Sequence, residues 1–314
     1  LRLCRFVWHC LTFRPQIIHL QGAQHPALYI LLWAMLRLLG SASFVYTPQD
    51  VLPNSLRPYH IRAFRFLYAR MRHVFLNAKQ NQPLVVEHFA VPRDRITVLP
   101  IADLTAFVRE HVAGEPPDIP AASRVVLCFG LIEPRKGIHT LLSAAPEVLR
   151  QVPDALLLIV GKPLMDIAPL QRQLTDLGLQ ERVRLVPQYV SFAQMAGYFT
   201  AARLLVLPYE NGWNSGVLAS AFGFGKPVIA TRVGGFDEVV SDESTGLLVP
   251  PKDPALLAQA IVRLLRDDVL YARMVTNVRQ AAAEISWEAI ARITAARYAD
   301  VVGIGADCAV SQAR

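Results

Sequence analysis

Short apolar runs alternate with longer amphipathic segments from residue 124 onward. The apolar runs cover residues 124–129, 155–160, 183–187, 203–207, 227–231 and 245–249. The intervening segments have helical spacing and begin near Gly137, Asp166, Ser191, Ser215 and Glu238. Strands separated by helices run parallel, because each connection crosses back over the sheet. The alternation therefore predicts a doubly wound parallel sheet, with ligands bound beyond the carboxyl ends of its strands.

The composition agrees with a sheet that is covered on both faces. Apolar residues make up 53% of the 314 residues and charged residues 18%, against about 25% charged residues in an average soluble protein. Such a composition excludes collagen-like, coiled-coil and intrinsically disordered chains. A chain of this length is expected to form about two domains.

The best domain boundary is a proline-rich stretch at residues 113–122, where three prolines exclude a helix. We therefore expect a linker there, a first domain at residues 1–112 and a second at residues 123–314. In the first domain we predict strands at 17–20 and 43–47, and helices at 26–39 and 62–75. The second domain should close with three helices that start near Asp253, Asp267 and Ser286.

Positive charge is concentrated in the first domain. The chain has 32 basic and 25 acidic residues, of which residues 1–120 hold 13 and 7. In the predicted helix at 62–75, Arg62, Arg65 and Arg72 share one arc. An acidic membrane surface is one explanation of this arc, and a packed helix with a solvated basic face is the other.

Two further features bear on location. The longest apolar run, residues 26–36, is too short to span a bilayer, which takes about 20 residues. The four cysteines have neither zinc-site nor disulfide spacing, which favours a reducing compartment. We therefore expect a cytoplasmic protein without a transmembrane helix.

The first segment that suggests chemistry is Gly130-Leu-Ile-Glu-Pro-Arg-Lys-Gly137, which leads from a predicted strand into a helix. Its glycines allow a close backbone approach. Arg135 and Lys136 place cations beside the free amides of a helix N-terminus, an arrangement that suits a diphosphate. A basic surface loop is the alternative interpretation.

A second strand-to-helix loop spans residues 208–218. Ser215 and Gly216 open its helix, so the Ser215 hydroxyl and the amides of Gly216 and Val217 suit an anion. A structural N-cap explains Ser215 equally well. Glu210 adds a side chain suited to sugar or ribose hydroxyls.

In a third segment, residues 225–238, a buried strand runs into a Gly-Gly turn. Asp237 and Glu238 then stand in the first turn of a helix. Helix capping is the usual reason for acids at this position, because negative charge suits the N-terminal end of the helix dipole.

Five stretches of the second domain carry a resemblance to a known family. They read FGLIEPRKGI from Phe129, LVLPY from Leu205, NSGVLA from Asn214, FGKPVIATRVGGFDE from Phe224 and STGLLVPP from Ser244. In this order they resemble the group 1 glycosyltransferases, or glycosyltransferase family 4, which have the GT-B fold. The resemblance extends over residues 124–300 and is weaker over residues 1–112.

The resemblance implies two Rossmann-like domains that face a cleft, with a nucleotide sugar held mainly by the second and the acceptor by the first. It implies no metal and no cofactor besides the donor substrate. The candidate donor-binding residues are Gly130, Arg135, Lys136, Ser215, Gly216, Val217, Leu218 and Glu238, and the candidate catalytic residues are Glu210 and Asp50. The charge of Lys136 would stabilise the leaving nucleoside diphosphate.

The second domain departs from the family pattern at two site positions. Leu131 stands where an arginine is usual, and Ser220 stands where a ribose-binding glutamate is usual. An earlier glutamate of the same pair corresponds to Gly212 or, in a shifted register, to Glu210 or Asn211.

The first domain also departs from the pattern. Gln49 replaces a histidine before Asp50, and Ile101 replaces another. No strand with a glycine-rich loop precedes Ile17, so we expect this domain to be incomplete.

These observations favour a hexosyltransferase of retaining type that moves a sugar to a saccharide or lipid-linked acceptor in polysaccharide or cell-envelope glycan synthesis. Its expected partners are the nucleotide sugar, the acceptor and an acidic membrane surface on the cytoplasmic side. The alternative is a catalytically impaired homologue or fragment that binds sugar nucleotides or acts as a scaffold, which the missing acids favour. Nucleic-acid binding is suggested only by the net charge of +7 and lacks a motif.

Overall fold

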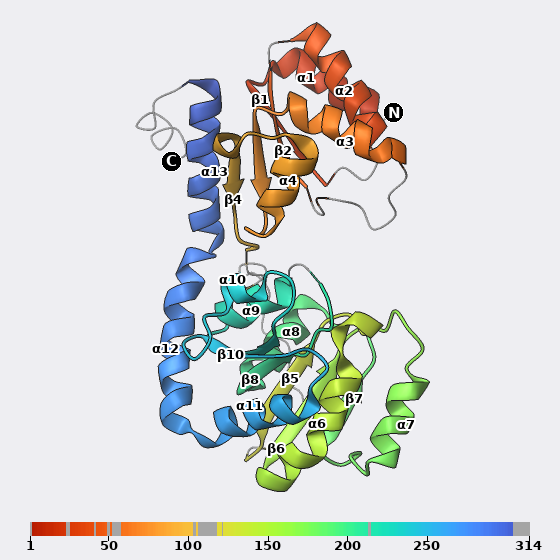
Figure 1. Ribbon diagram of the computed structural model, residues 1–314, viewed down its shortest axis with the longest axis vertical. Coiled ribbons are helices and arrows are strands. Elements are labelled where there is room, and N and C mark those ends of the chain that lie inside the picture. The colour runs from red at the N-terminus through yellow and green to blue at the C-terminus, as the bar shows by residue number, and fades with distance from the viewer. Residues whose placement is uncertain are drawn as a thin grey trace. The chain divides into compact units, whose positions relative to one another are not determined.

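The computed structural model describes residues 2–22, 26–40, 42–48, 51, 58–102, 105, 118–120, 122–212 and 215–303 (Figure 1). The chain divides into two units, each built on one parallel sheet. Unit 1 contains residues 1–100 and the chain from Ile290 onward, and unit 2 contains residues 101–289. The predicted α/β class with two parallel sheets is therefore confirmed.

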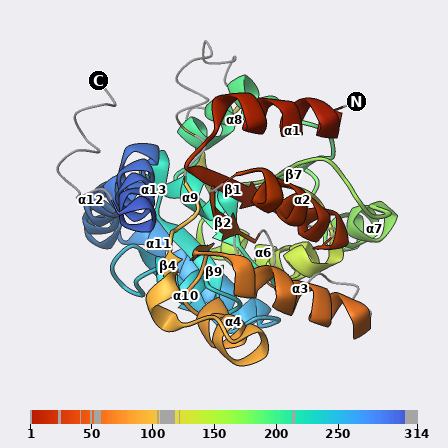
Figure 2. The ribbon, with the colours of Figure 1, turned by 90° about the horizontal axis from the view of Figure 1, so that it is seen from above.

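Unit 1 has a four-stranded sheet in the order β1-β2-β3-β4. Its strands are β1 (Ile17–Gln21), β2 (Ser43–Thr47), β3 (His73–Leu76) and β4 (Ile96–Val98). Its helices are α1 (Arg2–Phe13), α2 (Pro26–Leu39), α3 (Pro58–Arg70), α4 (Asn81–Phe89) and the short η1 (Arg93–Arg95). Helix α2 lies between α1 and α3 (Figure 1 and Figure 2). No helix within the described ranges is both long and apolar enough to cross a bilayer.

The two faces of this sheet have different partners, because successive side chains of a strand point to opposite faces. Phe44 and Tyr46 of β2 belong to the core beneath α1 to α4. Val45, between them, belongs to a second core that packs against Ile290 and Tyr298. These last two residues lie in α13 (Trp287–Val302), the last described helix.

The place of α13 differs from the expected domain division, which kept residues 123–314 together. From Ile290 onward the chain groups with unit 1, because the second face of that sheet presents Val45 and Phe75 and needs an apolar cover. The expected linker at residues 113–122 lies mostly outside the described residues.

The predicted helix at residues 62–75 is wrong in its second half. Helix α3 ends at Arg70, and residues 73–76 form β3. Val74 and Phe75 are both fully buried, and they belong to the cores on opposite faces of the sheet. A strand allows two consecutive residues to be buried in this way, whereas one face of a helix does not.

Unit 2 has a six-stranded sheet in the order β10-β9-β8-β5-β6-β7, and every neighbouring pair is parallel. Its strands are β5 (Arg124–Phe129), β6 (Ala155–Val160), β7 (Val183–Val186), β8 (Leu204–Leu207), β9 (Val228–Thr231) and β10 (Gly246–Val249). All six strands that the sequence predicts are confirmed.

The helices of unit 2 follow these strands in turn. They are η2 (Pro134–Lys136), α6 (Ile138–Gln151), α7 (Ala168–Asp176), α8 (Phe192–Ala201), α9 (Gly216–Gly223), α10 (Phe236–Val239), α11 (Pro254–Arg266) and α12 (Asp268–Glu284). The predicted starts of the last three helices are confirmed, since Asp253, Asp267 and Ser286 each accept a backbone amide of the first turn, at 2.9, 2.8 and 3.2 Å.

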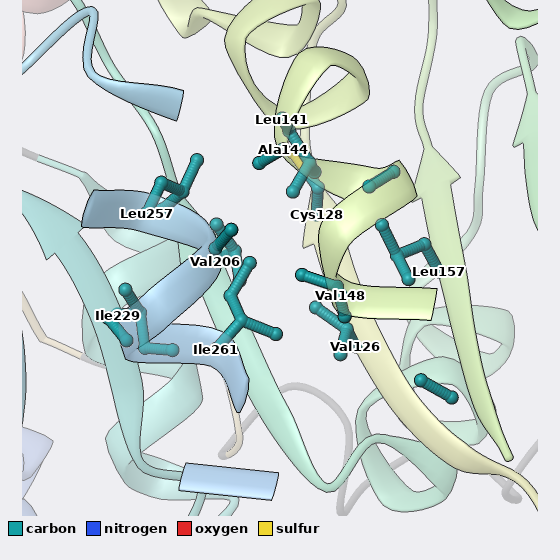
Figure 3. Packing of buried hydrophobic residues seen from close by; sticks show 14 of the residues in the cluster. Val126, Cys128, Leu141, Ala144, Val148, Leu157, Val206, Ile229, Leu257 and Ile261 are labelled. Carbon is teal, nitrogen blue, oxygen red and sulfur yellow. The ribbon is translucent and has the colours of Figure 1, made fainter. Parts of the chain in front are cut away.

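Helices cover both faces of the unit 2 sheet. On one face, Leu141 and Val148 of α6 and Ile261 of α11 pack over Val126 and Val206 of the central strands (Figure 3). The other face is covered by residues of α8, α9 and α12. This double cover explains the low charge content of the chain.

Replacing Ile261 by alanine should test this core, because the Ile261 side chain is fully buried. We expect Ile261→Ala to lower the unfolding free energy by about 2–5 kcal/mol through lost burial and a cavity. The exposed Gln259 of the same helix supplies the control, and Gln259→Ala should change stability by less than about 0.5 kcal/mol. Urea denaturation followed by circular dichroism measures both, and equal effects would contradict the assignment of this face of α11.

Candidate functional site

The candidate site lies at the carboxyl ends of β5 and β8, the central pair of the unit 2 sheet. From this pair, β6 and β7 continue on one side and β9 and β10 on the other. The helices that follow the pair, α6 and α9, contribute to cores on opposite faces. After β5 and β8 the chain therefore turns toward opposite faces of the sheet, which is the arrangement in which doubly wound sheets bind ligands.

Two glycines allow these loops to approach each other closely. Gly137, between η2 and α6, has a φ of 62°, and a Cβ atom there would lie 1.9 Å from the carbonyl oxygen of Pro208. Gly130, with a φ of 115°, faces Val217 of α9, and a Cβ atom on it would lie 3.2 Å from that side chain. The glycines were predicted to allow a close backbone approach, and here they allow the two loops to approach each other. The start of α9 therefore lies against the loop after β5.

A chain of polar groups connects the two loops. The Nζ atom of Lys136 donates a hydrogen bond to the hydroxyl of Tyr209 and lies 3.8 Å from the centre of its ring. The same hydroxyl lies 3.1 Å from the Oγ atom of Ser215. Lys136 and Tyr209 are both buried, so this series of polar groups runs through the interior between the two loops.

The N-terminus of α9 keeps free amide groups. Ser215 occupies the N-cap position, but its side chain makes no capping hydrogen bond and contacts Tyr209 instead. The Leu218 amide donates to the Ser215 carbonyl at 3.0 Å, so Leu218 does not offer the free amide that the resemblance implies. Among the described residues, no acceptor bonds the amides of Gly216 and Val217. These two amides and the helix dipole can accept an anion.

The charge of Lys136 is held at a cost to the fold. Its side chain is only 8% exposed, and burial, with the nearby Arg135 cation, lowers its pKa from 10.5 to about 8. Since each pKa unit corresponds to about 1.4 kcal/mol, the charged form is disfavoured by about 3 kcal/mol. No carboxylate of the described residues forms an ion pair with it. A buried cation without an internal counter-ion indicates a site for an anionic ligand.

Arg135 is less available than the sequence suggests. Its guanidinium forms an ion pair with Glu133 of the same loop at 2.6 Å, and it lies beside Gly212. The pairing neutralises much of its charge, so Lys136 is the dominant cation of the two.

Glu210 joins three parts of the site. Its backbone amide donates to the Arg135 carbonyl at 2.8 Å. Its two carboxylate oxygens lie 2.9 Å from the Nε2 atom of His139 and 3.2 Å from the Nζ atom of Lys252. The contact with His139 is close enough for an ion pair but lacks the alignment of a hydrogen bond. Glu210 is thus placed at the rim, one residue from Tyr209, and is held by two exposed basic side chains.

The remaining predicted residues are more dispersed. Ser220 is fully buried and its hydroxyl donates to the Gly216 carbonyl at 2.7 Å, so α9 carries no acid at this position. Glu238 is exposed in α10, a helix of four residues. Asp50 lies outside the described residues.

Sequence reasoning missed Tyr209, His139 and Lys252. Tyr209 ends one of the stretches that carry the family resemblance, but it contacts Lys136 across 73 positions of the chain. His139 lies in α6 and Lys252 in the loop between β10 and α11, and both contact Glu210. The strand order β10-β9-β8-β5 brings these positions together, and no local pattern in the sequence indicates it.

Comparisons with known proteins bear on the family and the fold of this chain. Residues 123–267 match the family described as glycosyl transferases group 1. The chain is 30% identical over 236 residues to D-inositol 3-phosphate glycosyltransferase of Corynebacterium efficiens, covering 72% of this chain and 55% of that protein. It is 38% identical over 174 residues to phosphatidyl-myo-inositol mannosyltransferase of Mycobacterium leprae, covering 55% and 45%. The chain therefore spans about half the length of the curated relatives it matches.

Solved structures share the fold at lower identity. Sucrose-phosphate synthase from Thermosynechococcus elongatus superposes with a TM-score of 0.72 at 24% identity, covering 96% of this chain and 77% of that one. Anabaena HepE in complex with UDP superposes with a TM-score of 0.78 at 21% identity, covering 95% and 82%. These likenesses confirm the fold that the family resemblance implies.

Removing the buried charge should stabilise the protein. The folded pKa of Lys136, about 8, lies below its ordinary value of 10.5, so its charged form opposes folding below pH 8, and this penalty fades as the pH rises toward 10.5. We expect Lys136→Met to raise the melting temperature at pH 7, and to do so less at pH 10.

Lys79 of unit 1 provides the control, because its side chain is exposed and its charge carries little burial cost. Lys79→Met should not stabilise the protein. Differential scanning calorimetry measures both variants, and a lower melting temperature for Lys136→Met at pH 7 would contradict the proposed cost.

Proposed function

The chain belongs to the group 1 glycosyl transferases, and on that basis we propose that it transfers a sugar from a nucleotide-diphosphate donor to a saccharide or lipid-linked acceptor. The observation that carries the proposal is the buried Lys136, which is linked through Tyr209 and Ser215 to the open N-terminus of α9. A cation and free amides lie together where the loops after β5 and β8 meet, and this combination suits the diphosphate of a nucleotide sugar.

In the proposed site, the Lys136 ammonium and the amides of Gly216 and Val217 hold the diphosphate, with the Ser215 hydroxyl as a further donor. Negative charge grows on the diphosphate as its bond to the sugar breaks. A cation that is already fixed in a dry site stabilises this charge without rearrangement. Binding would also raise the pKa of Lys136 again, because a diphosphate supplies the paired counter-ion that Lys136 lacks among the described residues.

The sugar end of the site is assigned to Glu210. Its carboxylate lies beside the proposed diphosphate site and carries two basic neighbours, and carboxylate oxygens accept hydrogen bonds from sugar hydroxyls. We propose a hexosyl donor, a retaining reaction without a metal, and a contribution of Asp50 from unit 1. The position of Glu238 in α10 suits support of the preceding Gly-Gly turn.

The proposed acceptor side is unit 1. The relatives named above are an inositol-phosphate glycosyltransferase and a phosphatidyl-inositol mannosyltransferase, which supports a phosphorylated or lipid-linked acceptor in cell-envelope glycan synthesis. Residues 1–100 contain twelve Lys and Arg against three Asp and Glu. This excess supports peripheral contact with an acidic membrane surface on the cytoplasmic side.

One observation favours a second function. Ser220 replaces the acid that the family places on α9, and its hydroxyl is used within the helix. A protein that binds sugar nucleotides without transferring the sugar would need Lys136 and α9 but not that acid.

The diphosphate site predicts a selective loss of nucleotide binding. We expect Lys136→Met to weaken binding of the preferred nucleotide among UDP, GDP and ADP by about 10- to 150-fold, because one charge-assisted contact contributes ~1.5–3 kcal/mol. Lys226 lies at the amino end of β9, away from the proposed site. Lys226→Met should therefore leave the affinity for the nucleotide within twofold. Isothermal titration calorimetry measures both, and unchanged affinity in Lys136→Met would reject the site.

The same site predicts a pH dependence. Affinity of the unsubstituted protein should fall between pH 7 and pH 9, because free Lys136 loses its proton near pH 8 and a neutral amine attracts a diphosphate weakly. Titrations at pH 8 in buffers of different ionisation enthalpy should show proton uptake on binding. In Lys136→Met both effects should disappear, and their persistence would assign them to another group.

The role of Glu210 is tested by turnover. Glu210→Gln removes the charge but keeps the size, and it should reduce hydrolysis of the preferred nucleotide sugar at least tenfold while nucleoside diphosphate affinity changes less than threefold. Glu238→Gln is the companion variant. A double variant with full turnover would remove both acids from the mechanism, and nucleotide binding without any turnover in the unsubstituted protein would support the binding or scaffold function instead.

A further inference from the structure

Unit 1 contains a basic pocket with a volume of about 250 Å³ at the amino ends of β2, β3 and β4. Sheets of this type bind their usual ligands at the opposite, carboxyl ends of the strands, so the pocket is separate from the edge expected to face an acceptor. Four of the residues that line it are arginines, namely Arg37, Arg70, Arg72 and Arg95. We call these four residues the arginine cluster.

The fold brings the arginine cluster together from four segments of the chain. Arg37 lies in the last turn of α2, and Arg70 is the last residue of α3. The Arg72 amide donates to the Phe44 carbonyl at 2.7 Å, which fixes Arg72 beside the amino end of β2. Arg95 ends η1, directly before β4. The pairing of β2, β3 and β4 therefore gathers cations that no local stretch of the sequence places side by side.

Within the described part of unit 1, nothing neutralises the arginine cluster. None of its four guanidinium groups forms an ion pair or donates a hydrogen bond there. The described carboxylates of residues 1–100 are those of Glu87 and Asp94, and both are exposed and outside the pocket lining. Since each guanidinium carries five N–H donors, the pocket presents many unused donors and a concentrated positive field.

Arg70 is ordered by aromatic rings and still keeps its donors. Its guanidinium lies 4.1 Å from the ring centre of Phe66 and 5.5 Å from that of Trp33. The two rings contact each other edge to face, with their centres 5.8 Å apart. A ring takes the flat face of a guanidinium and leaves the N–H groups in its plane available. A side chain held in this way loses little freedom when it binds a ligand.

Helix ends explain only half of the arginine cluster. A basic residue in the last turn of a helix interacts favourably with the negative end of the helix dipole, and this accounts for Arg37 and Arg70. Arg72 and Arg95 directly precede strands and lie outside the last turn of any α-helix. Four like charges around one pocket repel one another, so their convergence indicates an anionic ligand.

We propose that this pocket binds the phosphate group of a phosphate monoester, as a second anion site that is independent of the donor site in unit 2. A monoester phosphate carries nearly two negative charges and three terminal oxygens, which arginine pairs with parallel N–H donors. A phosphate diester carries a single charge and would leave more of the cluster unpaired. The pocket is smaller than the roughly 300 Å³ at which sites for whole small molecules begin, so the rest of the ligand lies outside it.

The first test is isothermal titration calorimetry of the full chain with glycerol 3-phosphate. We expect saturable binding that persists in Lys136→Met and in the presence of the preferred nucleoside diphosphate, because the two sites are separate. The matched diester, glycerophosphoglycerol, should bind about tenfold more weakly, since it forms at least one charge-assisted contact fewer.

Two variants locate the binding in the pocket. Arg72→Gln with Arg95→Gln should weaken glycerol 3-phosphate binding roughly 25-fold, because one charged contact at an exposed site contributes about fivefold. Ala69 lines the pocket from α3 and is exposed. Ala69→Leu keeps a good helix former and all the charges, but it fills part of the pocket, so it should weaken binding as well.

The matched control is Arg5→Gln with Arg62→Gln, which removes the same charge from exposed positions of unit 1 outside the pocket lining. Its affinity for glycerol 3-phosphate should stay within about twofold, because distant surface charges are screened. Melting temperature and nucleoside diphosphate affinity should be unchanged in the pocket variants and in the control. A failure of this site is thereby distinguished from misfolding and from a failure of the donor site.

Vesicles of phosphatidylcholine with phosphatidic acid separate the two sources of a monoester. Co-sedimentation that glycerol 3-phosphate reverses assigns the site to a lipid headgroup, and calorimetric binding without co-sedimentation assigns it to a soluble phosphate ester. Either result supports the site. The proposal is overturned if neither probe binds, with glycerol 3-phosphate taken to about 10 mM. It is also overturned by equal affinity for monoester and diester, by an equal loss in the control, or by preferred binding of single-stranded RNA.

Discussion

The parallel pairing of β5 with β8 decides where this protein can bind a charged ligand. These strands are far apart in the sequence, and their pairing turns the following helices to opposite faces of one sheet. The loop that carries Lys136 then meets the loop that carries Tyr209 and the start of α9. The contact is possible because Gly137 has no side chain where the Pro208 carbonyl lies. Without this pairing, the chain would have a basic loop and a helix N-terminus but no common site.

The buried charge of Lys136 indicates what this position of unit 2 is for. Its side chain is buried with a lowered pKa, and no carboxylate of the described residues forms an ion pair with it. A buried charge costs stability, so its retention suggests a ligand that restores the balance.

The mistaken helix at residues 71–75 shows where periodicity fails. An apolar run between two elements satisfies both the helical and the strand pattern over a few residues. Val74 and Phe75 become strand residues because apolar layers on both faces of the sheet need them. For the same reason α13 leaves unit 2 and covers unit 1, since its apolar residues complete a face that the first hundred residues leave open.

Local information in the sequence was sufficient for the six strands of unit 2, for the capped starts of its last helices and for Lys136 and Ser215 as candidate residues. These features depend on periodicity, on side-chain capping and on loop chemistry, all of which act over a few neighbouring residues. Tertiary structure alone decided that Ser215 bonds Tyr209 instead of capping its helix, that Arg135 is neutralised by Glu133, and that Glu210 lies between His139 and Lys252. Those outcomes depend on which strands are neighbours, and strand order is set by burial of the whole sheet, which no short stretch of sequence encodes.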